Sequence, residues 1–436
     1  MSVSRSKTGS ASNGQNFRAI RALRIFVHGR RESSSEQKSV KRQTGRSRYR
    51  HAARPNGPEF RVERCCGNVE SARVNPKEFA AIARRLMSCP AAPFHEAGVR
   101  AVVELICAEN GLAFRRDAFG NVIVRLGNGA AGRPFVLAAH MDHPGFEIVR
   151  PLGSRRWVAR FNGGVPDYYF HPGIPVRLLP GVIPARLGKR LGADKVFEVI
   201  ASGIDLNHQP HPHFAVWELE DFALRKGKIH GRSCDDLIGV AAVLATMIEL
   251  KRARARVHVI GVISRAEEIG FQGALTVADA KLLPKNSLIV SLETSKELPP
   301  TKMGRGVILR VGDRSSIFDS AGMRFLSEVA ASLQVKDKKF QFQRALMFGG
   351  TCEATAFQEF GYQVTAVCVA LGNYHNCHPR GRIAAEYVSL IDACSLVQLL
   401  VEAARQMRAY DRLTVKLPQR LRALLKEARR NLRRKA

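Results

Sequence analysis

The chain has 436 residues, of which 45% are hydrophobic, and carries a formal net charge of +31. A chain of this length and apolar content can bury a substantial core in one large domain or two smaller ones, which excludes a wholly disordered protein. Its apolar runs are shorter than the roughly 20 residues of a membrane span, and the N-terminus lacks the apolar segment of a signal peptide. We therefore expect a cytoplasmic protein with no membrane partner.

Cysteine usage points to the same compartment. The nine cysteines form an odd, scattered set without a C-x-x-C pair. This pattern favours reduced thiols in a cytosol-like environment and argues against a disulfide scaffold or a structural zinc site.

The positive charge is concentrated at the two ends of the chain. Residues 1–75 contain 17 Lys and Arg against 5 Asp and Glu, and residues 412–436 contain 10 against 1. The remaining residues keep only about one third of the net charge. A nucleic acid or another acidic surface is therefore expected as a partner only through the basic tails.

Each tail has more than one interpretation. Residues 1–75 are rich in Ser, Arg and Gly with little to bury, which predicts a disordered extension. Contact with an acidic partner, import into an organelle, and the absence of any structural role all fit this composition. Residues 412–436 place leucines near helical spacing between Arg and Lys, which predicts a solvated terminal helix or one that binds RNA or an anionic surface.

Between the tails, residues 76–151 and 231–411 alternate between helical and strand patterns. In chain order the patterns predict helices over 77–87 and 96–111, strands over 120–127 and 133–148, a helix over 237–250, strands over 257–264 and 286–293, a helix over 320–334, a strand over 363–372 and a helix over 386–407. Strands that are apolar on both faces and separated by helices predict an α/β fold, with a mostly parallel or mixed sheet covered by helices on both faces.

Residues 152–230 interrupt this alternation. They are rich in Pro, Gly and short β-type runs and contain no convincing helix. We expect a small β-barrel or sandwich inserted between two strands of the α/β core, which would then be discontinuous.

Polar residues stand where the predicted core strands end. Ligand sites in open α/β sheets lie beyond the carboxyl ends of the strands, so these side chains can converge. At such ends, or at the start of the helix that follows, lie His140, Asp142, Asp235, Asp236, Glu267, Glu268, Glu293 and His375.

Carboxylates that converge need positive charge between them, because like charges a few ångströms apart disfavour joint ionisation. Two divalent metal ions meet this need, and a mixture of imidazole nitrogen and carboxylate oxygen suits zinc, with cobalt or manganese as alternatives. Such a pair lowers the pKa of a bound water towards about 7. One glutamate of the Glu267–Glu268 doublet can then bind a metal while its neighbour takes the proton from that water.

Eight short motifs follow one another over about residues 76–410: "PAAPFHEAGVR", "FRRDAFGNVIV", "AAHMDHPGFEI", "GRSCDDLIGVA", "RAEEIGFQGA", "SLETS", "FGGTCEATAF" and "GNYHN". Each motif alone is common, but their order and spacing are specific. In these motifs the chain resembles the co-catalytic dinuclear metallopeptidases, and among them the tetrahedral aminopeptidases, also called glutamyl or deblocking aminopeptidases and often labelled cellulase-like endoglucanases.

The resemblance implies a role for each site residue. It implies Glu267 as the general base and acid, Asp142 as the carboxylate that orients the ring of His140, and a cis peptide bond between Asp235 and Asp236. The implied metal ligands are His140, Asp235 as the bridging ligand, Glu268, Glu293 and His375.

Several positions depart from the family pattern or have a second interpretation. The family usually ends in Arg-Tyr-x-His-Ser-Pro, whereas "GNYHNCHPRG" offers both His375 and His378; we favour His375 because it follows the strand most closely. Cys352 replaces a common Asp, which affects the substrate pocket, and Glu293 replaces another Asp. The two aspartates at 235 and 236 also fit a plain helix cap. The histidines of "HQPHPH" (His208, His211 and His213) are expected in a surface loop.

The implied function is removal of N-terminal residues from peptides by a metal-activated water, in a homo-oligomer assembled through the inserted β-domain. One alternative is a deacylase, amidohydrolase or carboxypeptidase of the same clan. Another is an inactive fold that binds nucleic acid through its basic tails. The endoglucanase label fits poorly, because glycoside hydrolysis needs two metal-free carboxylates across the sugar.

Overall fold

The computed structural model describes residues 75–127, 132–203 and 211–435. Almost all of the predicted disordered extension, and His208 of the histidine-rich loop, therefore lie outside the described residues.

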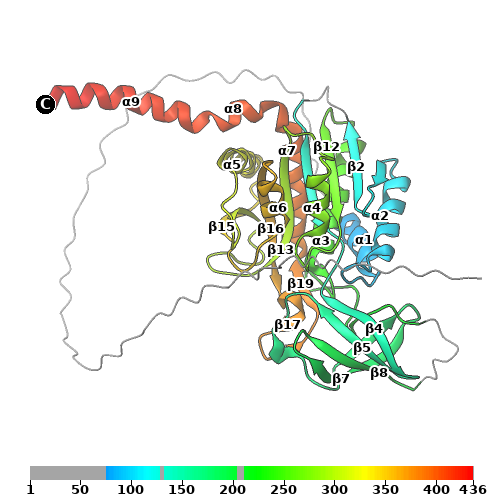
Figure 1. Cartoon of the computed structure of the whole chain (residues 1–436). Helices are drawn as coiled ribbons and strands as arrows, with labels where there is room; N and C mark the ends of the chain where they lie inside the picture. Colours follow the sequence, from blue (N-terminus) through cyan, green and yellow to red (C-terminus); the bar gives the residue numbers. More distant parts are fainter. Residues whose placement is uncertain (1–74, 128–131, 204–210, 436) are drawn as a thin grey trace, which may run out of the picture. The chain divides into compact units, whose positions relative to one another are not determined.

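A large mixed sheet forms the centre of the α/β part of the chain (Figure 1). Its path runs β1-β2-β12-β3-β13-β16-β19-β11-β10, and β14 and β15 are added beside β16. The strands are β1 (Ala113–Arg116), β2 (Val122–Gly127), β3 (Phe135–His140), β10 (Ala223–Arg225), β11 (Lys228–Gly231), β12 (His258–Ser264), β13 (Leu288–Lys296), β14 (Val307–Gly312), β15 (Phe342–Leu346), β16 (Gln363–Gly372) and β19 (Glu386–Ser389).

Helices cover both faces of this sheet, as the sequence predicts. Successive residues of a strand point to opposite faces, and the strands accordingly divide their buried side chains between two apolar clusters. One cluster takes Leu137 together with α1, α2, α3, α5 and α7, and the other takes Ala138 together with α4 and α6. The helices are α1 (Pro76–Met87), α2 (Ala97–Glu109), α3 (Cys234–Arg252), α4 (Gln272–Asp279), α5 (Ser320–Lys336), α6 (Glu353–Glu359), α7 (Leu390–Gln406), α8 (Tyr410–Thr414) and α9 (Lys416–Lys435).

The four inner strands β12, β3, β13 and β16 run parallel. Parallel neighbours need a crossover connection and bury both faces, which fits the wholly buried β3. Their carboxyl ends therefore meet at one edge of the sheet, and the predicted α/β fold with a mixed sheet is confirmed.

The insert is a closed β-barrel of six strands in the order β4-β5-β8-β7-β6-β9. Aromatic rings fill it, with Phe146 against Trp217 at 4.9 Å between ring centroids. The barrel strands are β4 (Gly145–Gly153), β5 (Arg156–Asn162), β6 (Pro175–Leu179), β7 (Ile183–Gly192), β8 (Val196–Ala201) and β9 (Phe214–Trp217).

The insert differs in its borders from the predicted span 152–230. The apolar run 133–148 reads as one strand, but it divides into β3 of the sheet and β4 of the barrel, because the chain leaves the sheet at "MDHP". At the other end, β10 and β11 belong to the large sheet through pairing of β11 with β19.

The C-terminal segment forms the predicted helix, α9, shown in red in Figure 1. The side chains of residues 419–433 on it are exposed. Among the described residues, no helix is both long and apolar enough to span a membrane.

Candidate metal centre

The carboxyl ends of the parallel strands bring the predicted site residues together in two groups, each of which could hold a metal ion. One group contains His140, Glu267 and Glu293, and the other contains Asp235, Glu268 and His375. Within each group the possible ligand atoms lie within 4.8 Å of one another.

Asp235 lies between the two groups. Its Oδ1 is 3.7 Å from Nε2 of His140, and its Oδ2 is 3.6 Å from Nε2 of His375. Each oxygen of this carboxylate therefore faces a different histidine.

The two adjacent aspartates at the start of α3, Asp235 and Asp236, have different surroundings. Their peptide bond is cis, as the resemblance implies, and both residues have non-helical backbone angles. The Asp236 carboxylate accepts a hydrogen bond of 3.1 Å from the Gly239 N–H and so caps the helix. The cap interpretation thus describes Asp236, whereas Asp235 faces the site.

The Glu267–Glu268 doublet lies beyond the end of β12, in a turn rather than on a strand. Both backbone N–H groups donate to the carboxylate of Asp142, at 2.9 Å from Glu267 and 3.1 Å from Glu268. The preceding residue, Ala266, has a left-handed φ of 49° and donates its N–H to the buried Glu96. This turn lets two neighbouring side chains face one site, which the alternation of a strand would prevent.

Neighbouring oxygen atoms fix the orientation of both histidine rings. His140 Nδ1 lies 3.1 Å from the backbone oxygen of Asp142 and 3.5 Å from its carboxylate. His375 Nδ1 lies 3.2 Å from the carbonyl oxygen of Gly164, which the inserted barrel domain supplies. Both rings therefore present Nε2 to the site, since a ligand histidine is held through its other nitrogen.

Three further buried residues support the centre and were not singled out from the sequence. His143 lies between the carbonyl oxygen of Asp235, 2.8 Å away, and the side-chain oxygen of Asn376, 2.9 Å away. The carboxylate of Glu386 on β19 accepts the Asp235 N–H at 3.0 Å. The spacing H-x-D-H could have drawn attention to His143, but nothing in the local sequence marks Glu386.

Burial and mutual repulsion disfavour the ionised form of several carboxylates in the site. Burial raises the pKa of Glu268 well above its ordinary value, and the charges of Asp235 and Glu267 add to the rise. Burial likewise raises the pKa of Glu267 and that of Glu293 to about 8. These groups ionise readily only if positive charge is placed beside them.

His140 shows the complementary effect. Burial alone lowers its pKa, but the charge of Glu267 and the carboxylates of Asp142 and Asp235 outweigh burial and raise it well above the ordinary value. The carboxylates around His140 thus favour a positive charge beside them.

The oxygen atoms of the site fit a pair of metal ions. Buried carboxylate oxygens on Asp235, Glu268 and Glu293 have no hydrogen-bond partner among the described residues. Buried polar atoms without partners are uncommon and costly, and the donor set of two imidazoles and several carboxylates suits zinc, cobalt or manganese.

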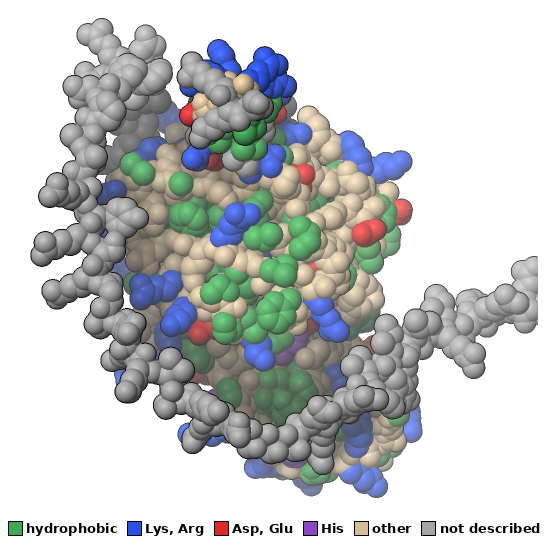
Figure 2. Space-filling view, turned by 90° about the vertical axis from the view of Figure 1, so that its left-hand side faces the viewer, with side chains coloured by type: hydrophobic (Ala, Val, Ile, Leu, Met, Phe, Trp, Pro, Cys, Tyr) green, Lys and Arg blue, Asp and Glu red, His purple; other side chains and the backbone are tan. Residues whose placement is uncertain are grey.

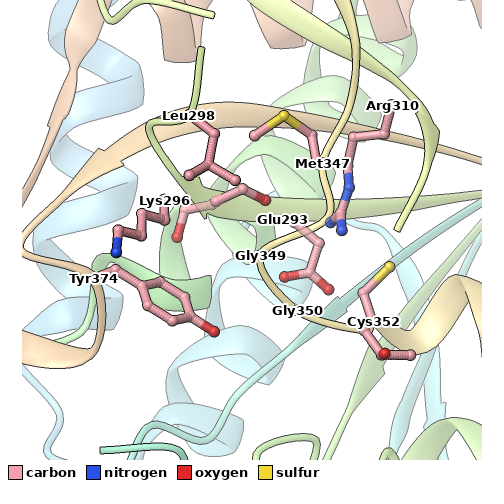
Figure 3. A pocket seen from close by; sticks show the side chains of 12 residues that line it. Glu293, Lys296, Leu298, Arg310, Met347, Gly349, Gly350, Cys352 and Tyr374 are labelled. Atoms are coloured by element: carbon pink, nitrogen blue, oxygen red, sulfur yellow. The ribbon is translucent and has the colours of Figure 1, made fainter. Parts of the chain in front are cut away.

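A pocket opens beside Glu293 (Figure 3). Its lining includes the buried guanidinium of Arg310, the Cys352 thiol and the Tyr374 ring. Cys352, the departure from the family pattern noted in the sequence, therefore contributes to a pocket next to the candidate centre.

The remaining candidate histidines lie outside both groups. His378 accepts a hydrogen bond of 3.1 Å from the Arg380 N–H through Nδ1, so the structure brings His375 rather than His378 to the cluster. In the inserted domain His211 and His213 are exposed, and neither is in a metal-binding group of the described residues.

Residues 210–389 match the model of a family described as M42 glutamyl aminopeptidase. This matched segment contains all candidate ligands except His140.

Three solved structures resemble the chain over most of its length. The TET1 peptidase of Pyrococcus horikoshii is 21% identical, with 76% of this chain and 100% of that chain covered and a TM-score of 0.63. A TET aminopeptidase from a marine sediment archaeon of the Thaumarchaeota is 18% identical, with 77% and 99% covered and a TM-score of 0.65. An aminopeptidase from Desulfurococcus kamchatkensis is 19% identical, with 75% and 94% covered and a TM-score of 0.63. These likenesses establish the fold.

Proposed function

We infer that this chain, whose residues 210–389 match the M42 glutamyl aminopeptidase family model, is a metallo-aminopeptidase that removes N-terminal residues from peptides. The observation that carries the inference is the placement of Asp235 between two groups of candidate ligands.

We propose that His140 and Glu293 would hold one divalent ion, that Glu268 and His375 would hold the other, and that Asp235 would contribute to both sites. Zinc suits this mixture of nitrogen and oxygen ligands best, with cobalt or manganese as alternatives. Such ions would polarise the scissile carbonyl, lower the pKa of the attacking water and bind the free α-amino group of the substrate.

The remaining chemistry belongs to Glu267. Its Oε2 lies 3.9 Å from Nε2 of His140, beside the first group of candidate ligands. From there it takes a proton from the attacking water and passes it to the leaving amine as the peptide bond breaks. Burial raises the pKa of Glu267 above its ordinary value, which makes this carboxylate a better proton acceptor.

The test is hydrolysis of matched free and N-acetylated peptides by the full chain, with zinc or cobalt and with a chelator. We expect cleavage of the free peptides only, and its loss with the chelator. Glu267→Gln should lower kcat by a factor of about 100 to 10,000 while zinc still binds, whereas the exposed Glu297→Gln serves as a matched control. Equal or preferred cleavage of acetylated peptides would identify a deacylase instead.

We also propose that the protein is a cytoplasmic homo-oligomer. The TET1 peptidase of Pyrococcus horikoshii can assemble into a tetrahedron or a large octahedral shell. In the present chain the inserted domain exposes Tyr168, Val182 and Leu191, at 64%, 61% and 41%, which suits an interface between copies. All cysteines among the described residues are free thiols, as expected in a reducing compartment.

A further inference from the structure

The C-terminal helix α9 contributes no residue to the candidate metal centre. Its apolar and its basic side chains lie on different faces of the helix. Its residues 419–433 are exposed. None of the ion pairs found among the described residues involves this helix.

One face of α9 is apolar. At 100° per residue, Leu421, Leu424, Leu425 and Leu432 fall within an arc of about 100°. These four leucines are 55%, 50%, 50% and 71% exposed. A single exposed leucine needs no explanation, but an aligned row of them indicates a surface that is covered in the working protein.

The adjoining face is basic. Arg422, Lys426, Arg429, Arg430 and Arg433 line a shallow depression together with Leu425. Glu427 is the one acidic residue between Lys416 and Lys435. Hydrophobic and basic side chains are both visible on this helix, which is seen nearly end-on at the top of Figure 2.

The positive charge of α9 indicates which kind of partner could cover its apolar face. A second copy of α9 would bring two rows of arginine and lysine together, and this repulsion opposes pairing. A nucleic acid would neutralise the cations through its phosphates but would leave the leucine row exposed. A bilayer with anionic headgroups satisfies both faces, because leucines enter the boundary of the acyl chains while arginines contact the phosphates.

We propose that α9 binds an anionic phospholipid surface and lies parallel to it. This surface contact does not require a membrane-spanning segment, but it departs from the expectation, based on the lack of such a segment, that the protein has no membrane partner. The helix would bring the peptidase to the membrane without changing its catalytic centre.

The test is flotation of the full chain with vesicles of phosphatidylcholine alone or with about 30% phosphatidylserine. We expect binding to the anionic vesicles that weakens as salt is raised. Replacing Leu421, Leu424 and Leu425 by serine, or Arg429, Arg430 and Arg433 by glutamine, should each lower the bound fraction about tenfold. Peptide hydrolysis without vesicles should be unchanged in both variants, which shows that they are folded.

The other results overturn the proposal. Full binding by the leucine variant would mean that charge alone, at either tail, attracts the vesicles. Tight binding to a single-stranded RNA that is lost only in the arginine variant, without any vesicle binding, would identify a nucleic-acid helix. A free dimer that dissociates in the leucine variant would identify self-association.

Discussion

At the scale of single residues, Asp142 connects the two parts of the centre. Its carboxylate accepts the N–H groups of both members of the glutamate doublet and lies 3.5 Å from the ring of His140. An aspartate can accept all of these hydrogen bonds, whereas asparagine would turn an NH₂ group towards one of the N–H donors.

We therefore expect Asp142→Asn to lower zinc affinity, activity or both by about 10- to 100-fold, as is usual for residues that orient metal ligands. Zinc competition with a chromophoric chelator and kcat/KM measure the two effects. Asp279→Asn at the exposed end of α4 is the matched control. Unchanged affinity and activity would show that the backbone of the turn holds the doublet without this carboxylate.

The site residues that could be predicted are those that belong to a recognisable local sequence motif. The strand ends, the doublets and their order led to the cluster now formed by His140, Asp235 and His375. Glu386 could not be found in this way, because its partner lies 151 residues earlier in the chain and only the pairing of β19 with β16 and β11 brings it to the site.

Among the helices and strands, the first turn of α3 is packed so closely against the capping carboxylate of Asp236 that a larger side chain would not fit beside it. A Cβ added at Gly239 would lie 2.2 Å from a carboxylate oxygen of Asp236. The sequence predicted this helix, and the resemblance implied Asp235 as a metal ligand, but local pattern alone could not tell which aspartate caps the helix, since both satisfy the same capping pattern.

Gly239→Ala should therefore displace the cap and lower the free energy of unfolding by about 1–3 kcal/mol, the usual cost of overpacking. Zinc affinity should fall as well, because Asp235 immediately precedes the cap. Gly98→Ala in α2 is the control, since its Cβ would meet nothing closer than 3.6 Å and helical alanine is favoured over glycine. Urea denaturation and zinc titration distinguish the two variants; equal stability would contradict the close contact.

For the molecule as a whole, the proposed homo-oligomer predicts that charged substitutions on the exposed surface of the barrel disrupt assembly. Tyr168→Glu combined with Leu191→Glu places charge on exposed apolar positions of the inserted domain, so it should yield smaller particles by light scattering. Val335→Glu on α5, where the side chain is 71% exposed, is the control outside the barrel. Particles of unchanged mass in the barrel variant would place the interface elsewhere.

The charge balance of the centre also predicts how the stability of the whole chain depends on pH. Burial raises the pKa of Glu293 to about 8 and raises that of Glu267 and Glu268 as well. The pKa of His140 is raised by neighbouring carboxylates despite its burial. Between roughly pH 4.5 and 8 the metal-free folded chain thus holds more protons at these groups than the unfolded chain does.

Stability falls with rising pH wherever the folded state binds more protons. We therefore expect the urea midpoint of the chelated protein to decrease from about pH 5 to about pH 8 relative to that of the zinc-loaded protein. Bound cations would replace the protons on the same carboxylates and also stabilise the folded state by mass action, so the two curves should separate as the pH rises. Parallel curves across this range would mean that the clustered carboxylates do not bind the metal.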